Sequence, residues 1–281
     1  MNRKVLQVTL SVVILLSLAV GSFNILQNRE ITPKNIWAAV SQNTYQRPVY
    51  SYQHALTTLW NSHKRDYVED GTNRLVEVDN QSVTTSLGIA QMLSQAVYED
   101  DKEAFNNILE WVISNMIIDS DGEFAFVSEW GENPQGEWTI TDSSVTLRDN
   151  ALILQAFTFA KYRWATPEYD EYIYSMAEYI WGNHVRQFNG RNLVYSYRVD
   201  ENTVGLRVSD LTPQVYMAVA PIDTYRDWGS LIEYSLEYGA RAVDAVEFSD
   251  YEDIQDLRYV YEFEEDYFEL ERFETSDDTD T

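Results

Sequence analysis

The sequence predicts an all-α domain built from paired amphipathic helices. Apolar residues recur with the period of a helix in several stretches, and residues that start or stop helices stand between those stretches. Hydrophobic residues make up 44% of the 281-residue chain and aromatic residues 14%, which is enough for one sizeable buried core. We expect about seven or eight helices beyond the first 50 residues.

The helical period is clearest in four stretches, in which apolar residues fall at i, i+3, i+4 and i+7. Thr166-Pro167 and Thr212-Pro213 each place a capping hydroxyl before a first-turn proline, which predicts helix starts there. Asp100-Asp101 separates two helical stretches as tightly as in an αα-hairpin. The four stretches are Phe105–Met116, Ile153–Trp164, Ile173–Trp181 and Trp228–Gly239.

Two longer segments lack a helical period. Asp119–Ser144 is rich in glycine, glutamate and tryptophan, and we expect an irregular loop there. In Phe188–Asp210, Leu193, Tyr195 and Tyr197 alternate with polar residues and predict a short strand.

The N-terminal segment has the pattern of an export signal. Arg3 and Lys4 precede an uncharged, apolar stretch from Val5 to Asn28, as in a secretion signal or an N-terminal membrane anchor. We expect residues 1–28 to be this leader and residues 29–47 to be a polar linker. Ala19-Val20-Gly21 could be cleaved, so secretion and anchoring both stay open. The predicted location is outside the cytoplasm, with membrane contact only through the leader.

Composition excludes several classes of function. The net charge of −26 argues against a nucleic-acid partner, because phosphate binding needs a basic surface. The absence of cysteine rules out disulfides and thiolate metal sites. His54, His63 and His184 are scattered without metal-ligand spacing. We therefore expect no metal and no cofactor.

Acidic residues concentrate at the C-terminus. Residues 244–281 hold sixteen acidic residues against two arginines, so more than half of the net charge lies there. Tyrosine and phenylalanine alternate with these acids up to Phe268, which predicts a helix or strand packed on the domain, whereas 276–281 reads as a solvated tail. The predicted helical domain is therefore 48–243, followed by an acidic segment, 244–281.

Three stretches, in the same order along the chain, resemble glycoside hydrolase family 8, whose members include bacterial endoglucanases and chitosanases. Leu59–Asn115 is similar to a helix-turn segment of that family with its Thr-Ser-Glu-Gly motif and following hairpin. Thr146–Trp164 is similar to a signature with two aspartates that opens an apolar helix. Leu211–Leu236 is similar to a Pro-Ser-Tyr segment and its next helix. The residues that carry the match are Thr85, Ser86, Gly88, Met92, Ala96, Val97, Asp100, Asp101, Lys102, Phe105, Trp111, Ile153, Ala156, Ala160, Trp164, Pro213, Tyr216, Trp228 and Leu231.

The resemblance implies a fold and an activity. The fold is an (α/α)6 toroid, here incomplete because a full toroid has about twelve helices and the sequence predicts fewer. The activity is hydrolysis of a β-linked polysaccharide with inversion, which uses one carboxyl group as acid and another as base. The acid of the family falls at Leu87, which cannot donate a proton. The signature aspartates fall at Arg148 and Asn150, which leaves Asp149 as the candidate base.

The loop between these motifs supplies candidates for substrate binding. A tryptophan ring can cover the C–H face of a sugar while carboxylates accept hydrogen bonds from its hydroxyls. Glu129, Trp130 and Trp138 combine these groups, although the tryptophans could equally fill the mouth of the domain.

The sequence supports two hypotheses about function. The first is an exported protein of the family 8 type that acts on or binds a β-linked polysaccharide, with the usual acid and base replaced. The alternative is a pseudoenzyme that binds a glycan or a protein without hydrolysis. A purely structural helical surface protein is a third possibility.

Overall fold

The computed structural model describes residues 52–77, 83–120, 123–188, 190–245, 257–262 and 267–272. The chain divides into two compact units, Met1–Tyr52 and Gln53–Thr281, and the elements below belong to the second unit apart from the first residue of α3. The predicted leader and linker lie outside the described residues. Among the residues described, none of the helices has both the length and the apolar character needed to cross a bilayer.

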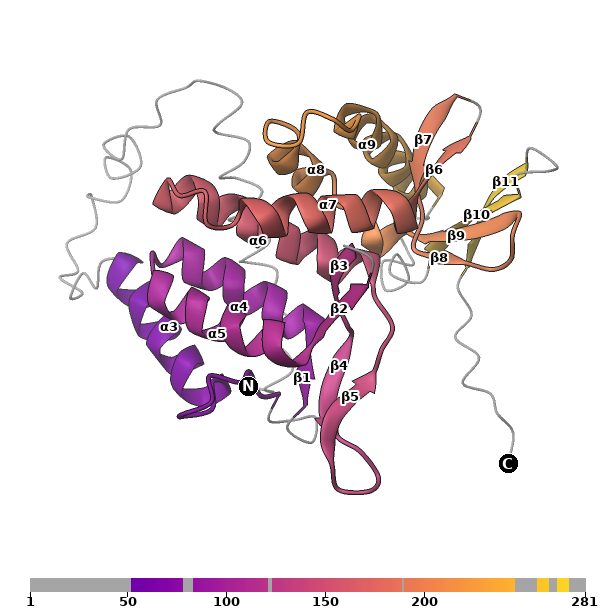
Figure 1. Cartoon of the computed structure of the whole chain (residues 1–281). Helices are drawn as coiled ribbons and strands as arrows, with labels where there is room; N and C mark the ends of the chain where they lie inside the picture. Colours follow the sequence, from indigo (N-terminus) through magenta and orange to yellow (C-terminus); the bar gives the residue numbers. More distant parts are fainter. Residues whose placement is uncertain are drawn as a thin grey trace, which may run out of the picture. The chain divides into compact units, whose positions relative to one another are not determined.

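Seven α-helices are present in the described part of the chain, together with one short 3-10 helix, η1 (Val208–Asp210), which confirms the predicted all-α class. The helices after α3 form three hairpins, α4–α5, α6–α7 and α8–α9. The first members of the hairpins, α4, α6 and α8, pack against one another in a row (Figure 1). The helices are α3 (Tyr52–Tyr67), α4 (Ser86–Tyr98), α5 (Lys102–Asn115), α6 (Leu147–Trp164), α7 (Asp170–His184), α8 (Pro213–Val219) and α9 (Trp228–Ala245).

Capping residues explain where several helices begin. The hydroxyl of Thr85 accepts a hydrogen bond of 3.1 Å from the Gly88 N–H and so caps α4. Asp101 caps α5 in the same way, through a bond of 3.0 Å from the Ala104 N–H. Pro213 opens α8 as predicted, whereas α7 begins at Asp170 because Pro167 opens only a turn.

The core lies between the three hairpins. Helix α6 contacts α4, α7 and α8, and it therefore buries residues on most of its circumference rather than along one stripe. Burial of apolar surface, which contributes about 25 cal/mol per Å² removed from water, is the main stabilising term for such a core. The largest side chains with almost no exposed surface include Trp228, Tyr169, Tyr216, Phe105 and Phe157.

Antiparallel strands occupy the two segments that lack a helical period. Asp119–Ser144 was expected to be irregular, but it forms two hairpins, β2–β3 and β4–β5, because Asn133-Pro134-Gln135-Gly136 makes a tight turn. The predicted strand around Leu193 is present as β7 and β8. The strands are β1 (Thr84–Thr85), β2 (Ile117–Ser120), β3 (Glu123–Phe126), β4 (Glu129–Glu132), β5 (Trp138–Asp142), β6 (Val185–Phe188), β7 (Arg191–Val194), β8 (Tyr197–Arg198), β9 (Thr203–Arg207), β10 (Leu257–Glu262) and β11 (Tyr267–Arg272).

These strands connect parts of the chain that are far apart in sequence. β1 pairs with β4, which places the start of α4 beside the β4–β5 hairpin. β10, from the acidic C-terminal segment, pairs with β9 in a sheet of order β11-β10-β9-β8. The hydroxyl of Tyr259 on β10 donates a hydrogen bond of 2.6 Å to the Tyr238 carbonyl, and both side chains are buried.

Candidate active site

The start of α4 is the place where the candidate residues come together. The Ser86 hydroxyl, in the first turn of α4, donates a hydrogen bond of 2.8 Å to Oδ2 of Asp149, in the first turn of α6. The Arg148 guanidinium donates to Oδ1 of the same carboxylate at 3.1 Å. Two of the sequence motifs therefore meet at the adjacent N-termini of two packed helices, although Ser86 and Asp149 are 63 residues apart.

Three groups surround the Asp149 carboxylate. They are the Arg148 guanidinium, the Ser86 hydroxyl and the N-terminal end of α6. The residue is 6% exposed, so only a small part of it meets solvent. These groups suit a base that activates a water molecule, provided that the water enters a confined space.

Asn150 has a structural role instead. Its side-chain amide accepts a hydrogen bond of 2.8 Å from the Phe126 N–H and donates one of 2.9 Å to the Phe126 carbonyl. It also donates to the Thr146 carbonyl at 3.1 Å. An asparagine at this position therefore ties α6 to the end of β3. The side chains of Asn150 and Phe126 are both buried.

Glu129 lies on β4 directly across from Thr85 of β1. Side chains of directly opposed residues on neighbouring strands project from the same face, with Cβ atoms about 4.5–5.5 Å apart. Its carboxylate accepts a hydrogen bond of 2.7 Å from the Thr141 hydroxyl and is half-buried. The fold thus brings Glu129 and Asp149 to two consecutive residues, Thr85 and Ser86.

Glu77 is a third carboxylate at this place, and sequence reasoning missed it. The Thr85 hydroxyl donates a hydrogen bond to its Oε1. A Cβ atom added at Gly88 would lie 3.3 Å from that oxygen, so Glu77 sits against the first turn of α4. Its position depends on the bridge between Glu77 and Val83, which returns the chain toward α4 and has no local sequence signal.

Leu87 lies at the same helix start and is half-buried. It offers no proton donor, as the sequence predicted. A general acid near the start of α4 would therefore have to be one of the neighbouring carboxyl groups. Within the described residues there is also no group of three or more histidine, cysteine, aspartate or glutamate side chains arranged to hold a metal ion.

Trp130 and Trp138 form a stack on the β4–β5 hairpin. Their ring centroids are 5.2 Å apart with an interplanar angle of 30°, and Trp111 of α5 meets Trp130 edge-on at 5.0 Å. Trp130 is partly buried, whereas Trp138 is 45% exposed. Trp138 therefore combines a ring held by its neighbours with a large surface open to solvent, as stacking on a ligand would require.

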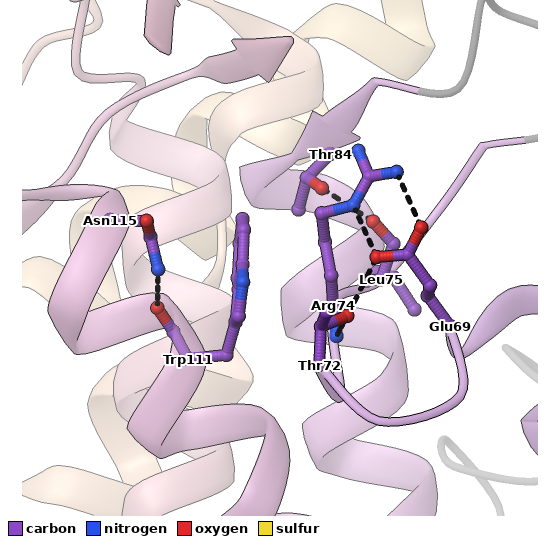
Figure 2. A network of polar contacts seen from close by, with 7 residues as sticks. All are labelled: Glu69, Thr72, Arg74, Leu75, Thr84, Trp111 and Asn115. Atoms are coloured by element: carbon purple, nitrogen blue, oxygen red, sulfur yellow. Dashed lines mark hydrogen bonds and ion pairs between the residues drawn. The ribbon is translucent and has the colours of Figure 1, made fainter. Parts of the chain in front are cut away.

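Arg74 holds this stack in place. Its guanidinium carbon lies 4.5 Å from the Trp138 centroid and 5.3 Å from that of Trp130, in cation–π geometry. Figure 2 shows the guanidinium bonded to the carboxylate of Glu69, beside Thr72 and close to Trp111. Hydrogen bonds from Arg74 and Thr72 lower the pKa of Glu69. A buried cation with a carboxylate partner thus orients the exposed tryptophan.

Comparisons with known proteins agree with the predicted resemblance. The family described as "Glycosyl hydrolases family 8" matches residues 33–247. An endoglucanase of Escherichia coli (strain K12) is 30% identical over 96 residues, which cover 34% of this chain and 26% of that protein.

Solved structures agree at the level of the fold. The endoglucanase Cel10 of Klebsiella pneumoniae, a family 8 glycosyl hydrolase, is 17% identical, with a TM-score of 0.61 over 75% of this chain and 66% of that one. An endo-1,4-D-glucanase from Vibrio fischeri ES114 is 19% identical, with a TM-score of 0.62 over 75% and 60%. The predicted fold, an incomplete (α/α)6 toroid, is confirmed. The chain covers less than two thirds of the length of these solved structures, 66% of the first and 60% of the second.

Proposed function

This chain belongs to family 8 of the glycosyl hydrolases, and we propose that it acts on a neutral β-linked polysaccharide at the start of α4. Glycoside hydrolysis in general uses two carboxyl groups on either side of the scissile bond. The observation that carries the proposal is that Asp149 accepts a hydrogen bond from Ser86 while Glu129 lies opposite Thr85, so both carboxyl groups meet consecutive residues at the start of α4.

The roles follow from the partners of each group. Asp149, with Arg148 and Ser86 as donors, serves as the base that activates water. Glu129, which accepts a hydrogen bond from the neutral hydroxyl of Thr141, supplies a carboxyl group toward the leaving oxygen. Trp138 stacks on the sugar chain. A neutral polymer fits a chain with a net charge of −26, which repels acidic polysaccharides at low ionic strength.

The test is release of reducing ends from glucan and xylan, two neutral polysaccharides, by the purified protein. We expect activity on at least one of them, with losses of roughly 100-fold or more for Asp149→Asn and for Glu129→Gln. Asp66→Asn, an exposed substitution on α3, serves as the control and should leave activity unchanged. Activity that survives both substitutions would remove the assigned roles.

A second candidate function is favoured by Leu87, which offers no acid at the start of α4. In this alternative the chain binds the polysaccharide without cleaving it. Calorimetry would then detect binding of a β-1,4-linked glucose pentasaccharide that is lost in Trp138→Ala and kept in Asp149→Asn, with no reducing ends released. Appearance of hydrolysis on Leu87→Glu would identify the missing acid as the cause.

We further infer that the protein is exported, because the basic residues and apolar stretch at its N-terminus match a secretion signal or anchor. Mass spectrometry of the mature N-terminus separates the two forms. A start beyond Gly21 indicates cleavage, and an intact leader in the membrane fraction indicates an anchor. Recovery of the intact chain in the cytosol would refute export.

A further inference from the structure

A polar pocket lies between α3 and α5. It has a volume of about 290 Å³ and is lined by α3, the loop after it, and the first half of α5. Val68, Ala104 and Ile108 supply apolar surface. Small-molecule sites combine apolar walls with a few polar groups and begin at about 300 Å³, so the size suits one small ligand.

An ion pair fixes one end of this pocket. Lys64 and Asp101 lie 2.6 Å apart, and the Trp60 indole N–H donates to the same carboxylate oxygen at 2.9 Å. Burial raises the pKa of Asp101, but the hydrogen bonds from Lys64, Ala104 and Trp60 outweigh it and leave the pKa lowered. Asp101 therefore stays charged, paired and fixed at the start of α5.

Three other polar side chains line the pocket without using their hydrogen-bonding capacity. Asn73, Glu103 and Asn107 make no side-chain hydrogen bond or ion pair to any residue that the structure describes. Asn73 and Asn107 are half-buried, and Glu103 is exposed at the rim. Two amides supply both donors and acceptors, and the carboxylate supplies acceptors, which is the mixture that neighbouring hydroxyl groups need.

We propose that this pocket binds one sugar residue of a neutral polysaccharide, outside the active site. The apolar wall faces the C–H surface of the ring, while Asn73, Asn107 and Glu103 take its hydroxyls. The ligand class rests on the proposed function, but the site does not. Asp101 follows the C-terminal end of α4, and Ser86 starts that helix, so one helix length of about 20 Å separates this end of the pocket from Ser86.

The role of such a site is to hold the polysaccharide while the active site binds another part of the same polysaccharide molecule. Two weak contacts with one polysaccharide molecule strengthen each other, because the second contact becomes intramolecular once the first has formed. The pocket should therefore increase the affinity for a polysaccharide more than the affinity for a single sugar.

The experiment titrates the full chain with glucose and with a β-1,4-linked glucose pentasaccharide, followed by NMR chemical shifts. Asn107→Ala and Asn73→Gly remove the two amides, and the glycine accommodates the positive φ of 61° at Asn73. We expect each to weaken binding at the pocket resonances roughly tenfold. Glu103→Gln is an exposed substitution that leaves the fold undisturbed and should weaken binding as well. Asn61→Ala on α3, outside the pocket, is the control.

The outcomes separate this inference from the proposed function. Pocket shifts that disappear in Asn107→Ala and persist in Trp138→Ala support the inference, even if no reducing ends are released. Binding that is unchanged in all three pocket variants but lost in Trp138→Ala overturns the inference and leaves the proposed function standing. Absence of saccharide binding at the pocket resonances overturns the inference, and the release of reducing ends then decides the proposed function separately.

Discussion

Asn150 holds the backbone of Phe126 through both its N–H and its carbonyl, and Phe126 has no exposed surface. Removing the amide leaves two buried backbone groups without partners, and each such group costs about 1–3 kcal/mol. We predict that Asn150→Ala lowers the free energy of unfolding by about 2–4 kcal/mol, measured by urea denaturation.

Asn115→Ala makes a matched comparison for that experiment. Asn115 donates only to the Trp111 carbonyl within its own helix and is half-buried. Its replacement should cost less than about 1 kcal/mol, because water can replace a partner at a helix end. Equal losses for the two variants would show that Asn150 is not a special tie between α6 and β3.

His184 makes stability depend on pH near neutrality. Burial lowers its pKa, while its hydrogen bond of 3.1 Å to the Tyr195 carbonyl and the charge of Asp210 act in the opposite direction. Because the folded pKa lies below the unfolded value of about 6.5, the unfolded chain binds the proton more readily. The part of the folding stability that depends on His184 is therefore fully present above about pH 6.5, and it decreases as the pH falls toward the pKa of the folded state.

We predict that urea midpoints fall between pH 7.5 and pH 5.5, and that His184→Gln removes much of this fall. His54 and His63 provide controls of the same residue type on α3. The same pH series is measured on His54→Gln and His63→Gln, and a fall that depends on them rather than on His184 would contradict the assignment.

Side-chain chemistry at the candidate site was only partly predictable from sequence. Leu87 and Asp149 could be identified because the resemblance to the family places its catalytic positions there. Glu77 could not, because its position depends on the pairing of Glu77 with Val83 and on the contact with Thr85. Pairings between residues that are close in space but carry no periodic pattern leave no signal in a single sequence.

The β8–β11 sheet contains a glycine that an aromatic ring covers. Gly205 on β9 pairs with Tyr197 on β8, and a Cβ atom added to Gly205 would overlap the tyrosine ring. We predict that Gly205→Ala lowers the free energy of unfolding by about 1–3 kcal/mol, as overpacking does. Thermal unfolding followed by circular dichroism measures the change.

Gly239 provides the opposite case within the same domain. It lies in α9, and the nearest atom to an added Cβ would be Leu211 Cδ1 at 3.9 Å, an ordinary contact. Gly239→Ala should raise the free energy of unfolding by about 0.5–1 kcal/mol, because alanine loses less entropy in a helix. Equal effects of the two substitutions would mean that Tyr197 moves freely away from Gly205.

At the scale of elements, the helices were predictable and the hairpins largely were not. Apolar residues recur with a helical period in α5, α6, α7 and α9, whereas β4 and β5 are short and mostly polar. A local signal did exist at Asn133–Gly136, where proline at the second position and glycine at the fourth are typical of a tight turn. The pairing of β4 with β1 is a tertiary contact and could not be read from the sequence.

At the scale of the whole molecule, composition and strand pairing divide the chain differently. The predicted boundary at residue 243 rests on the acidity of the segment that follows it. β10 nevertheless pairs with β9 along its length, and its Tyr259 meets Tyr238 edge-on at 5.0 Å. The charge of a segment does not decide whether it belongs to the folded domain. Backbone pairing and burial decide that.

This argument predicts that a chain ending at residue 256 is much less stable than one ending at residue 272. The shorter chain exposes Val204, Leu206 and Tyr238 and leaves β9 with β8 as its one remaining neighbour in the sheet. Loss of one buried aromatic side chain costs about 3–5 kcal/mol, so the free energy of unfolding should fall by at least about 3 kcal/mol. Ending at 272 removes only residues 273–281, including four acids, and should change stability by less than about 0.5 kcal/mol. Urea denaturation of the two chains at the same ionic strength distinguishes them, and equal midpoints would show that β10 adds nothing to the stability of the domain.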